Sequence, residues 1–578
     1  MNKKRLYIGL NDNYHDPSIT ILNDEGGVLY SESIERIIQY KRGLGCPSDP
    51  DVLINYVIED WAQYNGEEVV IATAWKKLRY TRSKLGAFIG LLNYDNDSWF
   101  YKLFKRMGAN QTFYHSSGRF VAAISQSGYG INDYLKFNFP EAIVHRKFYD
   151  HHLAHMVNGI HSTNEKNGVG LVIDAAERWV SVYNIENGYP GKALKINTKF
   201  SMGSIYFLLT SIIGYSYLKG EEWKVMGLSA YGSHNELFDK KLRELFGYEN
   251  GNFKSSSAAI GQLVEPIKNF ITSNNISHED VAFTGQALFE EYLLVLVGKA
   301  KKLVPNKTNI IISGGSALNS LAIGRLAEKK WFKNVIVPNA CGDDGNSLGA
   351  ALIAFREFNP KAKFPSDGLN RNPYSGGEIN SDELQKFVEN SQLPFKKFDN
   401  IAKVGAELLY ANKIIGWIQG RSEFGSRALG NRSILANPCY KENKERINAV
   451  VKFREGFRPF APSILHEFGD IYLQDYSITP YMEKALTFRE EVMESIPAVV
   501  HKDGTGRLQS VMKEMNSLYY ELISEFNNLS GIPIVVNTSY NVMGKPIAND
   551  INDVISLFFN SEIDALIIGD YLLERESF

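Results

Sequence analysis

A pattern of strand, polar loop and hairpin occurs twice in the chain, and this repetition limits the possible folds more than any other feature of the sequence. In the first copy, strands are expected at residues 5–10, 18–22 and 28–33. In the second copy, they are expected at residues 168–174, at residues 179–185 and from residue 192 onward. Apolar runs bounded by Gly, Asn and Asp are typical of strands joined by tight turns. The two copies predict a duplicated α/β unit.

Two units of strand, glycine turn and helix follow the second copy. Their strands are expected at residues 309–312 and 334–337, and their helices at residues 316–329 and 347–358. Each unit presents backbone N–H groups at the start of a helix, where anions bind well. The alternative is an ordinary packing turn, which a lone Gly-Gly pair by itself favours. A duplicated α/β unit is how the actin-like ATPase fold is built, so this is the fold class expected for the N-terminal domain.

A stretch rich in proline and glycine, residues 359–378, marks the best domain boundary. Beyond it, helices are expected at residues 384–388 and 402–410, and buried strands at residues 414–418 and 534–536. The length of 578 residues allows two to four domains. We therefore expect an N-terminal domain at residues 1–362 and a second α/β domain at residues 363–578.

The composition excludes several classes of protein. A net charge of -2 argues against a protein that coats nucleic-acid phosphates, which needs a sustained basic surface. Cys46, Cys341 and Cys439 are far apart, which argues against a disulfide scaffold and favours a reducing compartment. The N-terminus lacks the apolar segment of a signal peptide, and no run of about 18 apolar residues predicts a membrane span. These features predict a cytoplasmic protein.

Histidines suggest a metal site in the first domain. His151 and His155 are four residues apart, so on a helix they share one face. Asp174 and the pair Asp343-Asp344 follow expected strands and could complete the ligands. The alternative is a helix capped by Asp150 with partly exposed histidines. His15 stands apart in the loop between the first two strands, where a neutral-range pKa would suit a general base.

Basic residues gather in the second domain among glycines, without the spacing of a helix or strand face. Guanidinium groups bind phosphate or carboxylate with two parallel hydrogen bonds, and glycine lets the backbone approach a ligand. The alternative is a network of structural salt bridges. The basic residues are Arg421, Arg427, Arg432, Lys452, Arg454 and Arg458. Two loops with short polar or titratable side chains, 537–541 and 501–507, could also contact a nucleotide.

Motifs that run in order along nearly the whole chain resemble those of the O-carbamoyltransferases that modify nodulation factors, cephalosporins and aminoglycosides such as tobramycin. In the first domain they are His15-Asp16-Pro17-Ser18, Glu35-Arg36, His151-His152-Leu153-Ala154-His155, residues 224–232, residues 313–319 and Gly342-Asp343-Asp344-Gly345. In the second domain they are residues 423–433, 458–462, 501–505 and 537–541. The motifs of the second domain are the more specific, because a lone pair of histidines four residues apart is common.

This resemblance implies a two-domain enzyme. The N-terminal domain is expected to be similar to the actin-like fold of tRNA threonylcarbamoyl transferases, and the C-terminal domain to the YrdC-like fold. In the latter, Lys452-Phe453-Arg454 and Ser539-Tyr540-Asn541 match the nucleotide-binding motifs. The family forms carbamoyl-adenylate from carbamoyl phosphate and ATP in the C-terminal domain. The N-terminal domain then passes the carbamoyl group to a hydroxyl of a small-molecule acceptor, without nucleic acid or membrane as partner.

The resemblance also implies roles for single residues. His15 is the expected base for transfer, Lys452 and Arg454 are expected to act in adenylation, and Mg²⁺ is expected with ATP. An Fe²⁺-like ion is expected in the N-terminal domain, although N and O ligands also suit Zn²⁺ or Mn²⁺. Its ligands are His151, His155, Asp174 and Asp343. The nucleotide and carbamoyl phosphate contacts are Arg421, Arg427, Arg432, Lys452, Arg454, Arg458, His501, Asn537, Ser539 and Asn541. The adenylate contacts of the transfer domain are Lys224, Gly227, Gly314, Gly315 and Asn319.

Two departures from the family pattern lie in the transfer domain. Ala175 and Ala176 stand where the family has glycines after Asp174, and Trp223 stands where it has glycine between Glu222 and Lys224. These changes predict an altered contact with the adenylate and an unusual acceptor. Two rival functions are a sugar kinase on the same actin-like fold and a ligand-binding protein with a decayed transfer domain. The retained His15 and metal ligands argue against decay, and a kinase would not need a second domain with the arginine cluster and the Lys-x-Arg and Ser-x-Asn motifs.

Overall fold

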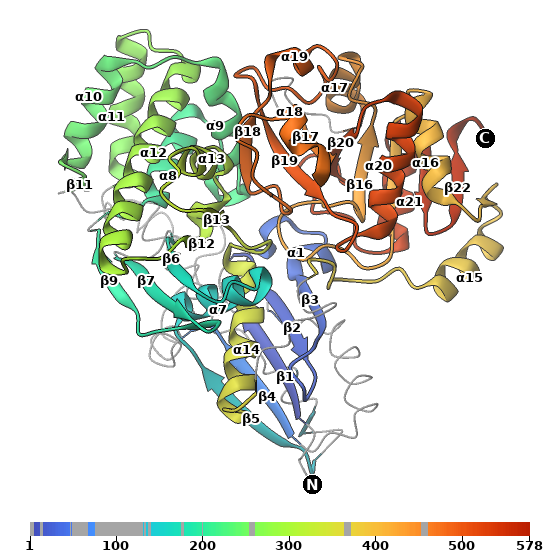
Figure 1. Ribbon diagram of the computed structural model, residues 1–578, viewed down its shortest axis with the longest axis horizontal. Helices are drawn as coiled ribbons and strands as arrows, with labels where there is room; N and C mark the ends of the chain where they lie inside the picture. Colours follow the sequence, from blue (N-terminus) through green and yellow to red (C-terminus); the bar gives the residue numbers. More distant parts are fainter. Residues whose placement is uncertain are drawn as a thin grey trace, which may run out of the picture.

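The structure is a computed structural model that describes residues 5–11, 15–44, 46, 48, 68–75, 131, 135–136, 140–174, 179–198, 200–253, 260–362, 372–451 and 460–577. Its fold is mixed α/β, with three large sheets. Two of these sheets are built from strands that end by residue 336, and the third from strands that begin at residue 396 (Figure 1).

The first sheet has the strand order β3-β2-β1-β4-β5. Its strands are β1 (Arg5–Asn11), β2 (Ser18–Leu22), β3 (Val28–Ser33), β4 (Glu68–Thr73) and β5 (Ile143–Phe148). Strands β1, β4 and β5 are parallel, whereas β2 is antiparallel to both of its neighbours. The hairpin expected at the N-terminus therefore forms, and it occupies one edge of this sheet.

The second sheet repeats this arrangement in the order β9-β7-β6-β12-β13, with β8 (Tyr189–Pro190) also pairing with β7. Its strands are β6 (Gly168–Val172), β7 (Trp179–Glu186), β9 (Leu194–Asn197), β12 (Asn309–Ser313) and β13 (Asn334–Ile336). Strands β6, β12 and β13 are parallel, and β7 is antiparallel to both β6 and β9. Order and direction match the first sheet strand for strand, so the predicted duplication is confirmed.

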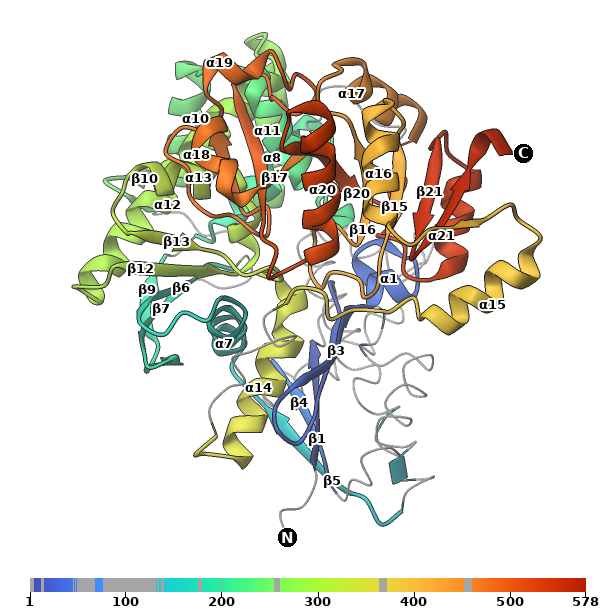
Figure 2. The ribbon, with the colours of Figure 1, turned by 45° about the vertical axis from the view of Figure 1, so that its right-hand side comes forward.

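Helices α7 (His151–Thr163) and α14 (Asn346–Phe358) pack against each other between the two sheets (Figure 2). Helix α14 contacts β1, β2 and β4, and α7 contacts β6 and β12. Glycine makes this packing possible, because a Cβ at Gly9 would lie 1.9 Å from the Ser347 oxygen and one at Gly349 would lie 2.0 Å from the Ala154 oxygen. This close approach holds the first turns of α7 and α14 next to each other.

Further helices cover the outer face of the second sheet, where apolar strand residues such as Leu171 and Ile312 join one large core with helix residues such as Leu208 and Leu288. The helices of this half are α1 (Ile34–Ile37), α8 (Gly203–Ile213), α9 (Glu222–Leu228), α10 (Glu236–Phe246), α11 (Ile260–Ser273), α12 (His278–Leu303) and α13 (Ser320–Glu328), with a short hairpin of β10 (Tyr248–Glu249) and β11 (Asn252–Phe253).

Helix α12 is long and apolar enough to cross a membrane by length and composition alone. However, 61% of its most apolar window is buried inside the protein, where it packs against α8, α9, α10 and α13. A core helix of a large domain shows the same pattern.

The third sheet has nine strands in the order β14-β22-β21-β15-β16-β20-β17-β19-β18. They are β14 (Lys396–Lys397), β15 (Ile415–Ile418), β16 (Arg432–Ala436), β17 (Ala461–Leu465), β18 (Lys484–Thr487), β19 (Thr505–Val511), β20 (Ile534–Ser539), β21 (Ala565–Ile568) and β22 (Tyr571–Glu574). The helices around it are α15 (Ser381–Ser391), α16 (Ile401–Tyr410), α17 (Glu442–Arg446), α18 (Gly469–Tyr472), α19 (Glu490–Met493), α20 (Ser517–Ser530) and α21 (Ile551–Phe559). Helices α16 and α20 pack side by side over buried Trp417 of β15.

Two local expectations were wrong in detail. The segment expected to be one helix at residues 316–329 is a short turn followed by α13, because the Asn319 side chain caps the helix that begins at Ser320. The strand expected at residues 168–174 ends at Val172, so Asp174 lies in the loop beyond it. The expected helix at residues 347–358 agrees with α14 to within one residue.

A buried ion pair joins the two halves of the chain. Arg36 of α1 lies 3.5 Å from Glu32, and both side chains are almost completely buried. The Arg36 guanidinium also donates to the backbone oxygens of Glu423 and Gly425, while Glu32 accepts hydrogen bonds from the Ser422 hydroxyl (2.7 Å) and the Gly377 amide (3.2 Å). In Figure 1, α1 lies on the side of the first sheet that faces the C-terminal half. The glycine- and arginine-rich loop of the C-terminal half is thus anchored on the first sheet.

Replacing Arg36 with methionine is expected to lower the free energy of unfolding by about 3–5 kcal/mol, because Glu32 would stay buried without its cation. Urea unfolding followed by tryptophan fluorescence would measure this. The control is Arg325→Met, since Arg325 and Glu328 form an exposed pair and should contribute less than about 1 kcal/mol. Equal losses in the two variants would contradict the assigned role of the buried pair.

Candidate metal and transfer site

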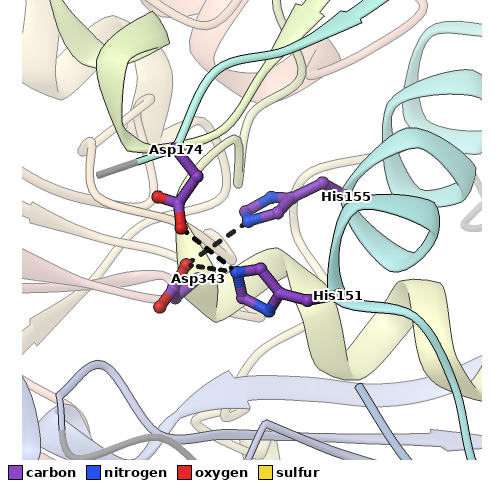
Figure 3. A group of neighbouring side chains, drawn as sticks. All are labelled: His151, His155, Asp174 and Asp343. Carbon is purple, nitrogen blue, oxygen red and sulfur yellow. Dashed lines mark hydrogen bonds and ion pairs between the residues drawn. The ribbon is translucent and has the colours of Figure 1, made fainter. Parts of the chain in front are cut away.

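Four side chains from three parts of the chain meet between the two N-terminal sheets (Figure 3). His151 and His155 extend from the first turns of α7, Asp174 follows β6 and Asp343 precedes α14. His151 Nε2 lies 3.3 Å from Asp174 Oδ2 and 3.4 Å from Asp343 Oδ1, and His155 Nε2 lies 3.3 Å from Asp343 Oδ1. One ligand atom from each residue falls within 4.8 Å of all the others. The sequence-predicted metal ligands therefore do come together.

Local sequence explains how each side chain reaches this point. The Asp150 carboxylate caps α7 by accepting from the Leu153 amide at 3.2 Å, so the helix begins at His151 and both histidines face the same side. Asp174 lies just past the carboxyl end of β6, and the loop after the nearby parallel strand β13 carries Asp343. Carboxyl ends of parallel strands share one edge of a sheet, which brings the two carboxylates together.

The charges in this group favour a bound cation. Burial opposes the charged form of His151, but the Asp343 charge and hydrogen bonds with Asp174 and Asp343 outweigh it and raise the pKa of His151 to about 10. Burial likewise opposes ionisation of Asp343, yet the His151 charge and hydrogen bonds from both histidines hold its pKa well below its usual range. Without a metal ion, a proton on His151 balances the carboxylates, and metal binding would release that proton.

The geometry fits a divalent ion. Ligand atoms about 2.1 Å from a tetrahedral ion are about 3.4 Å apart, and three of the measured separations are 3.3–3.4 Å. Two imidazoles and two carboxylates suit Fe²⁺, Zn²⁺ or Mn²⁺, and this donor set does not select one of them. The group can therefore hold a divalent metal ion.

His15 lies beside this group, with its Nδ1 atom 3.9 Å from Asp343 Oδ2. The same Nδ1 is 2.9 Å from Asp16 Oδ2, and Arg42 binds both oxygens of Asp16 at 2.8 and 3.3 Å. Burial opposes ionisation of Asp16, but the Arg42 charge and the hydrogen bond to His15 lower its pKa. An ionised Asp16 can accept a hydrogen bond from an N–H at Nδ1 of His15, and in that tautomer of a neutral imidazole Nε2 carries the lone pair.

The predicted Gly314-Gly315 turn borders the same group. Gly314 has a φ of +97°, and a Cβ there would lie 2.3 Å from the Ile173 oxygen, so only glycine fits without strain. A Cβ at Gly315 would lie 3.6 Å from Asp174 Oδ1. The turn therefore passes directly over one of the metal-ligand candidates.

Other predicted adenylate contacts have protein partners of their own. Asn319 exchanges hydrogen bonds with Gln286 at 2.9 and 3.1 Å besides capping α13. Lys224 lies 2.6 Å from Glu221 and over the Tyr215 ring. Gly227 is buried inside α9, and Trp223 at the start of that helix is 37% exposed. Ala175 and Ala176 lie outside the described residues.

Two of the predicted phosphate-binding arginines bind the protein backbone instead. Arg432 is fully buried and donates to the oxygens of Gln419 (2.7 Å), Asn431 (3.1 Å), Gly420 (2.9 Å) and Gly377 (3.0 Å). This corrects its expected role, because a guanidinium already bonded to four carbonyls has little left to offer a phosphate. Arg421 similarly donates to the oxygens of Leu29, Ser375 and Gly376. Both arginines shape the loop and its attachment to the first sheet.

Arg427 and His501 lie where the two halves of the chain meet. Arg427 makes a long hydrogen bond of 3.5 Å to the Leu318 oxygen, next to the Gly314-Gly315 turn. His501 is buried, with Nδ1 3.4 Å from Asp503 and its ring 6.2 Å from that of Tyr231 of the N-terminal half. Its Nε2 has no hydrogen-bond partner among the described residues. These two side chains remain candidates for contacting a substrate.

The predicted polar residues Asn537, Ser539 and Asn541 lie at the end of β20 and just beyond it. Asn537 is buried and donates to Ser463 (3.1 Å), Gln509 (3.0 Å) and the Ala428 oxygen (3.3 Å). Ser539 and Asn541 are hydrogen-bonded to each other at 2.8 Å. Lys452, Arg454 and Arg458 lie outside the described residues.

Several residues of the site were not predicted from the sequence. Asp16 and Arg42 orient His15, the Trp75 ring stacks on His151 with centroids 4.1 Å apart, and the Asn346 amide contacts both ligand histidines. Asp16 directly follows His15, and Asn346 lies one helical turn after Asp343, so sequence spacing could have indicated these two. Nothing in the sequence around Arg42 or Trp75 indicates their contacts.

Comparisons with known proteins show the family of the chain. Residues 7–352 match the family model of the carbamoyltransferase N-terminus, and residues 406–575 match that of the carbamoyltransferase C-terminus. The nodulation protein NolNO of Sinorhizobium fredii is 32% identical over 74% of this chain and 64% of its own length. NolO of Bradyrhizobium diazoefficiens is 32% identical over 74% of this chain and 79% of its own length.

A relative named for a cephem rather than for nodulation matches about half of the chain. The 3'-hydroxymethylcephem-O-carbamoyltransferase of Streptomyces clavuligerus is 32% identical over 51% of this chain and 53% of its own length. The aligned region thus covers somewhat less than two thirds of the first relative and about half of this one. Because the two family models together account for most of the residues on both sides of the proline-rich stretch, the chain belongs to the carbamoyltransferase family of enzymes.

Proposed function

We propose that the chain is an ATP-dependent O-carbamoyltransferase that first forms carbamoyl-adenylate and then transfers the carbamoyl group. Carbamoyl phosphate loses inorganic phosphate to water, and an oxygen of the resulting carbamate displaces pyrophosphate from ATP to form carbamoyl-adenylate. The carbamoyl group then passes to a hydroxyl of a small molecule, and AMP is released. The observation that carries this proposal is the position of His15 beside a buried metal-binding group, in a chain that matches both carbamoyltransferase models.

The transfer step is proposed for residues 1–362, in a fold of the actin-like type. The duplicated sheets around α7 and α14 support this fold. Nε2 of His15 accepts the proton of the acceptor hydroxyl. At the same time, the hydroxyl oxygen bonds to the carbamoyl carbon, and the bond between that carbon and the phosphate oxygen of AMP breaks. His151, His155, Asp174 and Asp343 would hold a divalent ion, which as a Lewis acid polarises a carbamoyl or phosphoryl oxygen.

The adenylation step is proposed for residues 363–578, in a fold of the YrdC-like type, with Mg²⁺ bound to ATP. The guanidinium of Arg427, the free Nε2 of His501 and the polar end of β20 support this placement. Lys452, Arg454 and Arg458 are proposed to offset the charges of ATP and carbamoyl phosphate. The loop that carries Arg427 is anchored on the first sheet, so the adenylate would form close to the domain that consumes it.

The acceptor is proposed to be a hydroxyl of a natural product or sugar. Relatives named for nodulation and for 3'-hydroxymethylcephem support this class of acceptor. A reducing compartment such as the cytoplasm is proposed as the location, which suits three cysteines that form no disulfide.

Release of pyrophosphate from ATP tests the proposal. We expect the purified protein with Mg²⁺ to release pyrophosphate only when carbamoyl phosphate is present, at a rate at least about 100-fold above the rate without it. Measuring AMP and ADP separately distinguishes the proposed transferase from a kinase and from a binding protein. Formation of ADP instead of AMP and pyrophosphate would favour a kinase, and no turnover with any divalent metal would favour a binding protein.

A further inference from the structure

Asn346 is the first residue of α14 and faces the two histidines of the metal group. Its side chain is completely buried. Its amide nitrogen lies 3.2 Å from His151 Nδ1 and 3.0 Å from His155 Nε2. Its amide oxygen has no hydrogen-bond partner among the described residues. A buried amide that contacts two imidazoles while its oxygen is unsatisfied needs an explanation, because a buried acceptor without a donor destabilises the folded protein.

The contact with His151 determines which nitrogen of that ring can bind a metal ion. Nε2 of His151 faces both carboxylates, so it is the atom available to the ion. A neutral imidazole that binds metal through Nε2 carries its proton on Nδ1, and that N–H needs an acceptor. The partner that the described residues offer to Nδ1 is the Asn346 amide.

The orientation of the amide then follows from the chemistry. An NH₂ group facing an N–H would place two donors against each other. A half-turn of the amide places its oxygen at that position instead, and the two orientations of a carboxamide occupy nearly the same volume. The stacked Trp75 ring, 4.1 Å from His151 and inclined by 25°, resists rotation of the imidazole, so the amide is the group that turns.

We propose that Asn346 is a positioning residue of the metal group: its amide oxygen accepts the Nδ1 proton of His151 and thereby directs Nε2 of that ring to the ion. This assignment rests on the metal-binding role proposed for the four ligands. Asp343 and Asn346 lie one helical turn apart, so the turn before α14 supplies a ligand and the first residue of α14 supplies the group that orients another ligand. Groups that orient a metal-binding histidine typically contribute 10–100-fold to metal affinity.

Titration of the metal-free protein with Co²⁺, followed by its visible absorption, tests this role without any assay of activity. We expect Asn346→Ala and Asn346→Leu to bind Co²⁺ about 10–100-fold more weakly than the unaltered protein. Asn346→Asp keeps an oxygen acceptor at the same position and should bind at least as tightly as the unaltered protein. Asn437→Ala removes a buried asparagine of the C-terminal half, which binds the Leu409 oxygen, and should leave Co²⁺ affinity unchanged.

The outcomes separate this assignment from the metal role itself. Equal Co²⁺ affinity in Asn346→Ala and the unaltered protein would overturn the assignment alone. Weak binding by Asn346→Asp, matching that of Asn346→Ala, would also overturn it, because an acceptor would then not be what the site requires. If the unaltered protein binds no Co²⁺, both the assignment and the proposed metal role fail. Circular dichroism of each metal-free variant distinguishes a lost contact from a lost fold.

Discussion

Replacing His15 with asparagine should lower the rate of carbamoyl transfer by about 10²–10⁴-fold, the usual contribution of a general base, and leave pyrophosphate release unchanged. Asparagine can still hydrogen-bond to Asp16, but its amide cannot accept a proton at neutral pH. The adenylation step should continue because His15 lies beside Asp343 in the N-terminal half. Carbamoylated acceptor and pyrophosphate, measured in the same reaction, report the two steps separately.

A matched control and a second variant make this result specific. His234 is exposed, so His234→Asn should leave both steps unchanged. Asp16→Asn should reduce transfer without reducing pyrophosphate release, because His15 would lose the carboxylate that holds its proton on Nδ1. Parallel loss of both products in His15→Asn would show that the two steps do not occupy separate sites.

Replacing Asp343 with alanine should lower the affinity for a divalent ion by more than about 100-fold, above the effect of losing an orienting group, and abolish carbamoyl transfer. Asp343 Oδ1 contacts both ligand histidines, and its charge is the main favourable influence on the raised pKa of His151. Its loss removes one ligand and weakens the attraction for any cation at the other three. Metal content after dialysis, measured by atomic emission, reports the change directly.

The carboxylate of Asp344, next to Asp343 in sequence, provides a control for the loss of negative charge near the metal group. Asp344 is not one of the four grouped ligands, and its Oδ1 instead accepts from the Gly345 amide at 3.0 Å. Burial raises the pKa of Asp344 to about 7, so the comparison is made above that pH, where Asp344→Asn removes one negative charge next to the site and should retain the metal. If Asp343→Ala also retained a full equivalent of metal, the four residues would be a hydrogen-bonded group rather than a metal site.

Features encoded within one element were predictable from sequence. The pairing of His151 with His155 follows from helical spacing, and the capping of α7 by Asp150 follows from residue type. The duplicated strand pattern likewise predicted a duplicated α/β unit, and the two sheets have matching strand order. In each case, the periodicity or turn chemistry of a short segment is enough to specify the structure.

The roles of the arginines could not be predicted in this way. One glycine-rich segment carries Arg421, Arg427 and Arg432, and the sequence suggested phosphate contacts for all three. In the structure, Arg432 donates to four backbone carbonyls. Arg427 instead reaches the opposite half of the chain. A guanidinium binds a carbonyl or a phosphate by the same N–H groups. Only the three-dimensional surroundings show which acceptor is near.

The sequence by itself determined the set of metal-ligand candidates, the repeated α/β unit and a local cluster of arginines and lysines in the second half, because residue type and local spacing encode them. Tertiary structure alone decided that Arg42 binds the Asp16 carboxylate beside His15, that the Trp75 ring stacks on His151, and that Arg36 joins the two halves. These contacts join residues far apart in sequence or on different elements, and their partners are selected by the packing of α7, α14 and the sheets. Short-range patterns carry no information about which distant side chain will be brought alongside.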